Sequence, residues 1–175
     1  MTTQQALDYI HSVCWKGMMP GLDRITILLE KLGNPHKTMK YVHIAGTNGK
    51  GSTASMTASI LRKAGYCTGL YTSPYIYQFG ERMQVNGEMI SDRELVDIVE
   101  YIKPLADTME ETPTEFELTT AIGFEFFKRR NCDIVVLEVG LGGLTNTNTV
   151  LLHFTQGGQR SPFTHVISFL HFVHL

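Results

Sequence analysis

The chain has 175 residues, of which 43% are hydrophobic, which is enough for one sizeable core but too few for two ordinary domains. Its 15 basic and 17 acidic side chains give a formal charge of −2; they form no run of one sign that would mark a nucleic-acid or membrane partner. Three scattered cysteines without CxxC spacing indicate neither a disulfide framework nor a zinc site, and with no secretory signal or apolar stretch of about 20 residues we expect a cytoplasmic protein.

The first third of the chain predicts two helices and a strand. Thr2 or Thr3 can cap a first helix, and leucines and isoleucines at helical spacing predict a second helix over residues 22–32. Gly33, followed by Asn34-Pro35, ends that second helix. The apolar, β-branched run at residues 41–45 then predicts a buried strand that leads into a glycine-rich loop.

The middle of the chain continues the alternation of helices and strands. Residues 52–64 predict a helix that ends before Gly65, and residues 67–71 predict the next strand. Residues 72–88 are polar and contain Gly and Pro, so we expect a loop, long enough that function is likelier than mere connection. Two capping boxes follow and open two further helices: Ser91 with Glu94, and Thr114 with Glu117.

A third apolar strand is expected at residues 133–138, followed by a second glycine-rich run at residues 140–143. Strands that alternate with helices favour an α/β fold with a parallel sheet flanked by helices.

The segment from residue 151 to residue 175 has a different character. It contains four histidines and no acidic residue, and it shows no sustained periodicity, so it finds no place in the expected sheet; the histidines are His153, His165, His171 and His174. These histidines could bind a metal, or the segment could be a frayed or aberrant tail. The tail is favoured because no cysteine or carboxylate lies nearby.

The glycine-rich loop between the first predicted strand and the following helix has the composition of a phosphate-binding loop. It consists of Gly46, Thr47, Asn48, Gly49, Lys50, Gly51 and Ser52. Glycines let backbone N–H groups approach phosphate oxygens, the helix N-terminus adds partial positive charge, Lys50 can reach the β- and γ-phosphates, and Ser52 can ligate Mg²⁺. The alternative is a glycine turn with an exposed lysine. The loop is a variant, because Ile44 fills the first glycine position and Gly51 separates the lysine from the serine.

Two oxygen-bearing residues are expected beside this loop. Glu138 closes the third predicted strand, and Ser73 follows the second; the carboxyl ends of parallel strands share one edge of a sheet. Both could ligate a metal. Alone, Glu138 would more often be an ordinary strand-end carboxylate, and Ser73-Pro74 could equally be a simple turn.

The motifs together resemble those of folylpolyglutamate synthase and dihydrofolate synthase, which belong to the Mur ligase superfamily. The resemblance runs from about Ala6 to Asn148 and rests on the segments AGTNGKGST (45–53), YTSPY (71–75), GERM (80–83), NGE (86–88), TEFE (114–117) and LEVGLGG (137–143). The glycine loop is shared across the superfamily, whereas the other segments are typical of the folate branch. The resemblance implies a P-loop NTPase-like sheet that forms part of the central ATP-binding domain.

The resemblance also implies an activity and its residues. The family is an ATP-dependent ligase that phosphorylates a folate carboxylate and lets the amine of L-glutamate attack the acyl phosphate, with ATP and Mg²⁺ required. Lys50 and Glu138 would serve catalysis, with the loop from Gly46 to Ser52 holding ATP. Ser52, Ser73 and Glu138 would hold the metal. Ser73, Pro74, Arg82 and Phe116 would lie near the folate, although Phe116 could equally be a core residue of an amphipathic helix.

The chain also departs from the family pattern. The family continues after Gly143 with Arg-Leu-Asp-x-Thr-Asn, but residues 144–148 here read LTNTN. We therefore expect residues 1–150 to be the N-terminal part of the ATP-binding domain, residues 151–175 to be a divergent tail, and the C-terminal glutamate-ligase domain to be absent. With about three strands, exposed apolar surfaces, poor solubility and little turnover are expected of this monomer. A nonenzymatic nucleotide-binding remnant and a muramyl-peptide ligase are the alternatives.

Overall fold

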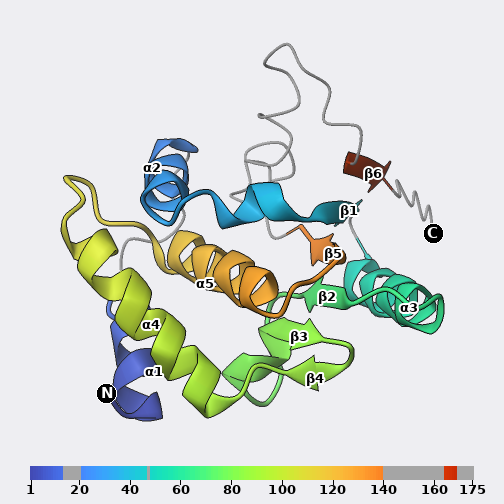
Figure 1. The fold of residues 1–175 in the computed structure, drawn as a ribbon, viewed down its shortest axis with the longest axis horizontal. Helices are drawn as coiled ribbons and strands as arrows, with labels where there is room; N and C mark the ends of the chain where they lie inside the picture. Colours follow the sequence, from blue (N-terminus) through green and yellow to red (C-terminus); the bar gives the residue numbers. More distant parts are fainter. Residues whose placement is uncertain (14–20, 47, 140–163, 169–175) are drawn as a thin grey trace.

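One sheet organises the computed structural model, which describes residues 1–13, 21–46, 48–139 and 164–168. Its strand order is β4-β3-β2-β5-β1-β6 (Figure 1). The strands are β1 (Lys40–Ala45), β2 (Thr68–Tyr71), β3 (Met83–Val85), β4 (Glu88–Met89), β5 (Ile134–Glu138) and β6 (Thr164–Ser168). The four strands β2, β5, β1 and β6 pair in parallel, while β3 and β4 add an antiparallel hairpin. The expected α/β architecture is confirmed, with a mixed rather than purely parallel sheet.

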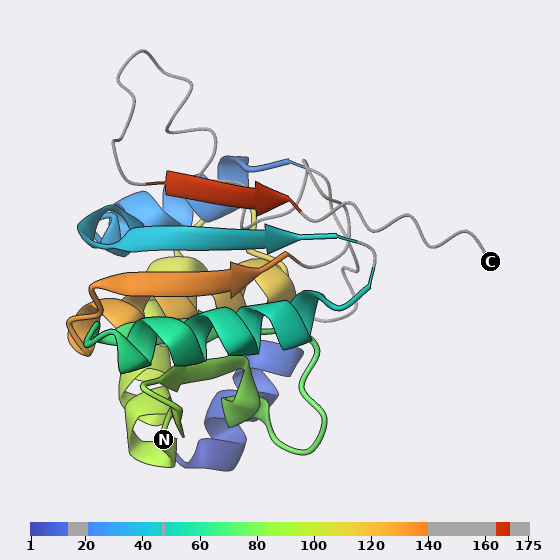
Figure 2. The ribbon, with the colours of Figure 1, turned by 90° about the vertical axis from the view of Figure 1, so that its right-hand side faces the viewer.

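Helices cover both faces of this sheet (Figure 2). They are α1 (Thr3–His11), α2 (Asp23–Lys31), α3 (Lys50–Lys63), α4 (Asp92–Asp107) and α5 (Glu115–Arg129). On one face α3 packs on a small apolar cluster formed by Val42, Ile44, Ala54, Ala58, Leu70 and Val136. On the other face α5 lies on the sheet, and α1, α2 and α4 pack around it over the larger core. The central strands are therefore buried on both sides, as their continuous apolar sequence indicates.

The approach of α5 to the sheet depends on a glycine in β2. A Cβ atom added to Gly69 would lie 2.8 Å from Cδ1 of Phe127 and 3.0 Å from Cγ2 of Val135. Real Cβ atoms do not approach carbon atoms so closely, so any larger residue would push α5 away from β2.

The helix boundaries follow the signals in the sequence. Capping boxes open α1 at Thr2, α4 at Ser91 and α5 at Thr114. Gly33 has a φ of 73° just after α2, which is the left-handed conformation expected of a residue that ends a helix. The helix after the glycine loop begins at Lys50, two residues before the predicted start, so Ser52 lies in its first turn.

The expectation of a loop at residues 72–88 is wrong for its second half. A 3-10 helix (Phe79–Arg82) leads into β3 and β4. Asn86 and Gly87 have φ angles of 54° and 85° in the turn between these strands. Asn-Gly is the preferred pair for such a two-residue hairpin turn, because both residues adopt positive φ at little cost. This signal was present in the sequence and was overlooked.

The expectation that the segment after residue 150 stays outside the sheet is also wrong in part. Residues 164–168 form β6, which pairs in parallel with β1, Tyr41 lying opposite Thr164 and Ala45 opposite Ser168. The sheet thus has six strands rather than about three. His165 lies in β6, whereas His153, His171 and His174 lie outside the described residues. The division of the chain at residue 150 stays a prediction.

None of the helices in the described residues is long and apolar enough to cross a membrane.

Candidate functional site

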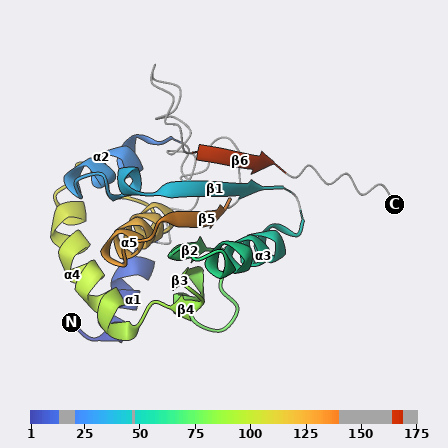
Figure 3. The same ribbon diagram turned by 45° about the vertical axis from the view of Figure 1, so that its right-hand side comes forward.

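The candidate site lies at the carboxyl edge of the three central strands. Ile44 of β1 is in register with Glu138 of β5, and Leu137 of β5 is in register with Tyr71 of β2. All three strands therefore end at the same level, and α3 begins at this edge directly after β1 (Figure 3). Ligands of open α/β sheets bind in this position, outside the carboxyl ends of the strands.

The glycine loop presents the first turn of α3 to the solvent at this edge. Gly49 is the N-cap residue with a φ of 73°, and as a glycine it provides no capping side chain. The amide of Thr53 donates to the carbonyl oxygen of Gly49 at 2.9 Å and closes the first turn. Backbone amides at a helix N-terminus attract anions. The side chain of Ser52 is exposed, Lys50 is half-buried and Asn48 is exposed, while Thr47 lies outside the described residues.

The carboxylate of Glu138 lies against this first turn. Glu138 is 7% exposed, and its Oε2 atom accepts a hydrogen bond from the backbone N–H of Ser73 at 3.2 Å. A Cβ atom on Gly51 would lie 3.5 Å from the same oxygen. The backbone beyond Glu138 is fixed as well, because the amide of Val139 donates to the carbonyl oxygen of Ile44 at 2.9 Å. The loop, Ser73 and Glu138 therefore come together, as the sequence predicts.

The electrostatics of Glu138 favour a cation. Burial raises the pKa of its carboxyl group, while the Ser73 N–H and the charge of Lys50 act in the opposite direction. A carboxylate that has lost much of its hydration gains more from a nearby positive charge than an exposed one does. Lys50 supplies one such charge.

The donor set at this edge suits Mg²⁺. Mg²⁺ is usually held by one or two carboxylates together with waters and substrate phosphates. The carboxylate of Glu138 and the hydroxyl groups of Ser52 and Ser73 are hard oxygen donors of this kind. No cluster of three or more His, Cys, Asp or Glu side chains occurs in the described residues, so these residues hold no cage built of protein ligands alone.

The segment after Ser73 is held in shape by one acidic side chain. The carboxylate of Glu81 accepts hydrogen bonds from the amides of Ile76, Tyr77 and Gln78 at 2.7, 2.9 and 2.9 Å. These amides lower the pKa of Glu81. Ile76 and Tyr77 are 80% and 90% exposed, so the loop displays two large apolar side chains beside the site. The Ser73–Pro74 peptide bond is cis.

Glu81 was not among the residues singled out in the sequence, although a signal was available. Gln78 and Glu81 have the spacing of a capping box, and they form one at the start of the 3-10 helix. An acidic residue three positions after a polar residue at the end of a Pro-containing loop indicates a capping box of this kind.

The four residues expected near the folate lie in two parts of the chain, the segment from residue 73 to residue 82 and α5. Ser73 and exposed Pro74 begin the loop. Arg82 ends the 3-10 helix, and its guanidinium carbon lies 5.3 Å from the ring centre of Tyr75 and 5.8 Å from that of Phe79. Phe116 is half-buried in the first turn of α5.

Tyr71 connects these two parts of the chain. Its hydroxyl group lies 3.3 Å from Oγ1 of Thr120, four residues after Phe116 and thus on the same face of α5. Arg82 acts on the same tyrosine, because its charge and its hydrogen bond lower the pKa of the hydroxyl group against the larger effect of burial. Arg82 and the first turns of α5 therefore both border the end of β2, where Ser73 follows.

The similarity of the chain to known proteins agrees with this arrangement. No family model matches the chain. A curated dihydrofolate synthase/folylpolyglutamate synthase of Bacillus subtilis is 43% identical over 153 residues, which are 85% of this chain and 36% of the relative. The crystal structure of folylpolyglutamate synthase from Thermotoga maritima is 44% identical with a TM-score of 0.78, and the match covers 85% of this chain and 35% of that one.

A solved FPGS–AMPPCP–folate complex matches with a TM-score of 0.81 and 35% identity, over 100% of this chain and 42% of that one. The chain thus spans about a third of the length of the curated relative, 36%, and the matched region is the N-terminal part. With its Mur ligase-type fold, the chain is thus similar to the N-terminal part of folylpolyglutamate and dihydrofolate synthases.

Proposed function

We propose that this chain is the ATP-phosphate-binding part of a ligase of the folylpolyglutamate synthase type. The observation that carries the proposal is the position of Glu138. Its buried carboxylate is held by the Ser73 amide beside the first turn of α3, where a metal-bound polyphosphate is expected to lie. The similarity of the chain to folylpolyglutamate and dihydrofolate synthases supports the same function.

Each residue of this edge has a distinct task in the proposal. The loop amides and Lys50 bind and orient the β- and γ-phosphates of ATP. Ser52, Ser73 and Glu138 hold Mg²⁺, which neutralises charge on the phosphates when it is bound. Lys50 and Glu138 are the catalytic residues in the sense that both touch the reacting phosphates or their metal. Phosphoryl transfer to a carboxylate needs positioning and charge neutralisation more than an acid–base pair, so these residues suit the phosphoryl-transfer step.

The acceptor in the proposal is a folate, whose terminal carboxylate takes the phosphoryl group and then forms an amide with L-glutamate. Ser73, Pro74, Arg82 and Phe116 are the proposed folate neighbours. Their placement around the end of β2 supports this assignment. The solved FPGS–AMPPCP–folate complex supports it too, because the match covers 100% of this chain and 42% of the chain in that complex. Exposed Tyr77 and Ile76 on the same loop offer apolar surface for an aromatic ligand.

The 175 residues alone are expected to bind nucleotide but to turn over slowly or not at all. They span 36% of the Bacillus subtilis relative, and the resemblance assigns the glutamate site and the closure over ATP to a C-terminal domain. A nonenzymatic remnant that at most binds nucleotide is therefore the second candidate. A muramyl-peptide ligase is disfavoured because the motifs at residues 71–75 and 137–143 suit the folate branch. We further propose a cytoplasmic monomer.

A titration experiment separates these functions. ATP with Mg²⁺, a folate, and a muramyl peptide are each added to the purified chain, and heats of binding and ADP release are recorded. The folate-ligase proposal expects binding of ATP·Mg²⁺ and of folate with little ADP release. Binding of the muramyl peptide instead of folate would replace it with the alternative ligase. If the chain unfolds cooperatively but binds none of these ligands, both ligase functions are excluded and only the nonenzymatic remnant is left.

A further inference from the structure

Two cysteines that lie far apart in the sequence meet at the edge of the sheet opposite the candidate site. Cys67 directly precedes β2, and Cys132 lies two residues before β5. The strands pair from Thr68 and Ile134 onward. This register extends backwards by one step, because the amide of Asp133 donates to the carbonyl oxygen of Cys67 at 2.9 Å and the amide of Cys67 donates to Oδ2 of Asp133 at 2.8 Å. Cys132 is thus the diagonal neighbour of Cys67.

The side chains of both cysteines border the larger core, and Cys132 can face this core because it lies outside β5, where the alternation of a strand does not fix its direction. Cys132 is 6% exposed within the larger core, and partly buried Cys67 packs against that core. Sγ of Cys67 lies 3.6 Å from the carbonyl oxygen of Arg130, two residues before Cys132. The thiols also touch each other, since a hydrogen bond between them and the charge of Cys67 add to burial in raising the pKa of Cys132.

We propose that Cys67 and Cys132 form a disulfide bond when the protein meets a small-molecule disulfide such as oxidised glutathione. In paired strands a diagonal offset of one residue leaves the two Cα atoms roughly 6 Å apart. Disulfides need a Cα separation of about 4.4–6.8 Å. The bond therefore requires rotation of side chains that already touch, and no rearrangement of the strands.

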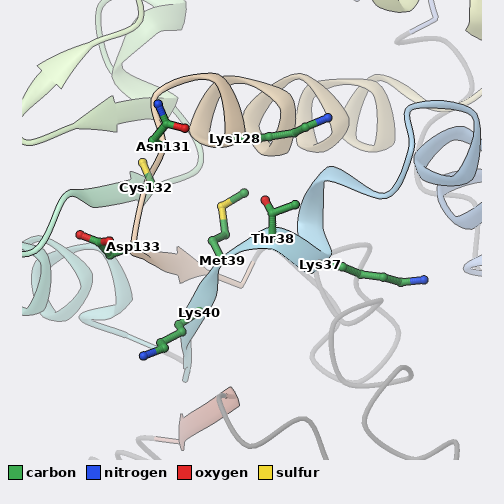
Figure 4. Close-up of a pocket in the computed structure, with 8 residues that line it drawn as sticks. All are labelled: Lys37, Thr38, Met39, Lys40, Lys128, Asn131, Cys132 and Asp133. Carbon is green, nitrogen blue, oxygen red and sulfur yellow. The ribbon is translucent and has the colours of Figure 1, made fainter.

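Access favours an order in which Cys67 reacts first. Cys67 is partly exposed, whereas Cys132 is buried. Burial and the neighbouring Cys67 raise the pKa of the Cys132 thiol to about 12, so this thiol is protonated near neutral pH and a poor first nucleophile. The region around Cys132 is nonetheless open on one side. It lines a hollow of about 640 Å³ that includes Met39, Lys40, Lys128, Asn131 and Asp133 (Figure 4).

The exchange proceeds in two balanced steps. The Cys67 thiolate attacks one sulfur of glutathione disulfide, the S–S bond of the reagent breaks, and one glutathione thiolate leaves and takes up a proton. Cys132 then loses its proton and attacks Sγ of Cys67 in the mixed disulfide, which releases the second glutathione as a thiol. Overall, two protein thiols are oxidised to one disulfide while one glutathione disulfide is reduced to two thiols.

The bond would join the starting ends of β2 and β5, whose other ends carry Ser73 and Glu138. It would restrict the unfolded chain by linking two residues distant in sequence, so it stabilises the fold. The candidate site lies at the other edge of the sheet and keeps its geometry. The inference is independent of the proposed function.

Peptide mapping tests the disulfide directly. The whole chain is incubated with oxidised glutathione at pH 8, alkylated, digested without reduction and analysed by mass spectrometry. We expect one cross-linked pair of peptides, carrying Cys67 and Cys132, whose mass is lower than the sum of the two thiol peptides by two hydrogens. The melting temperature should rise by several degrees and return on reduction, and formation should be faster at pH 9 than at pH 7.

The Cys14→Ser variant is the control and should form the same cross-link, whereas Cys67→Ser should not. Replacement of buried Cys132 can disturb folding. The peptide map of the wild-type chain is therefore the decisive measurement. The proposal is overturned if Cys67 is recovered alkylated, or only glutathionylated, or linked to Cys14.

Discussion

At the scale of single residues, the buried carboxylate of Glu138 is the strongest indication of a cation site. Its carboxylate is 7% exposed, accepts a hydrogen bond from the Ser73 amide, and lies close to Gly51. A buried acid at this edge costs stability unless a positive partner compensates for the lost hydration. The proposed metal and Lys50 together provide that compensation.

Replacement of Glu138 by glutamine should therefore separate metal binding from folding. The amide oxygen of Glu138→Gln can still accept the Ser73 N–H, but it carries no charge for Mg²⁺. We expect the gain in ATP affinity that Mg²⁺ provides to fall by roughly tenfold, or about 1.4 kcal/mol, with the free energy of unfolding little changed. Calorimetric titration with and without Mg²⁺ measures this, and Glu110→Gln at an exposed position is the control. An unchanged Mg²⁺ effect in Glu138→Gln would remove Glu138 from the metal site.

The sequence predicts which residues meet at this edge because they lie at the ends of strands, whereas their roles stay predictions. Glu138 closes an apolar run, Lys50 sits in a glycine loop, and the parallel register that brings them together follows from the alternation of strands and helices. The three amides bound by Glu81 could not be assigned in the same way. Their convergence on one carboxylate depends on the path of the loop from residue 76 to residue 81, which no periodic pattern encodes.

At the scale of elements, a buried ion pair fixes the start of α5. Nε of Arg24 in α2 donates to Oε2 of Glu117 at 3.1 Å. The same oxygen accepts the amide and hydroxyl hydrogens of Thr114 at 2.7 and 2.9 Å. Glu117 is 1% exposed and Arg24 is 7% exposed. The capping box was visible in the sequence, whereas its arginine partner from 93 residues earlier was not, because no local pattern reports a tertiary contact.

Removal of the arginine should destabilise the protein strongly. Arg24→Met leaves the Glu117 charge buried without its partner, and such losses cost about 3–5 kcal/mol. Urea unfolding at neutral pH measures the change. Arg93→Met is the matched control, because the Arg93 side chain is 91% exposed in a weak pair with Asp97, and it should cost less than about 0.5 kcal/mol. Equal effects of the two substitutions would show that the buried pair does not anchor α5.

The two elements missed in the sequence failed for different reasons. The β3–β4 hairpin has strands of three and two residues, too short for an alternating pattern to be recognised, although Asn86-Gly87 marks its turn. The strand β6 lies in a segment whose composition suggested no element, and it is defined by its pairing with β1. Long, capped helices such as α4 and α5 were predictable because several local signals agree.

At the scale of the whole molecule, two buried histidines link stability to pH. His36 and His43 are 3% and 2% exposed, and burial lowers the pKa of each to about 4. The unfolded chain binds protons with a pKa of about 6.5, so it takes them up first as the pH falls. Stability should therefore decline between about pH 6.5 and pH 4, by up to about 3 kcal/mol for each histidine.

Urea unfolding at pH 7.5, 6 and 5 measures this decline. The slope with pH should be smaller in His43→Gln, which has no proton to take up in either state. A flat profile in the wild-type protein over this range would show that the histidines are protonated in the folded state as well.

The outer face of α3 bears on solubility. Met56 and Ile60 lie one turn apart on this helix and are 60% and 68% exposed, which agrees with the expectation that apolar helix surface is uncovered. We expect the double substitution Met56→Lys and Ile60→Glu to raise the concentration at which light scattering reports association. The affinity for ATP should stay constant, because both side chains point away from the sheet. Association that is unchanged by the substitutions would place the responsible surface elsewhere.

The central claim is that the loop between β1 and α3 binds the phosphates of ATP. The most direct test is calorimetric titration of ATP·Mg²⁺ into the wild-type chain, Lys50→Ala and Lys63→Ala, with cooperative unfolding of all three confirmed by circular dichroism. Lys63 is the control because it is exposed at the opposite end of α3. We expect saturable binding to the wild-type chain and to Lys63→Ala, weakened at least about tenfold in Lys50→Ala. Equal affinities of the two lysine variants, or no binding by the folded wild-type chain, would contradict the claim.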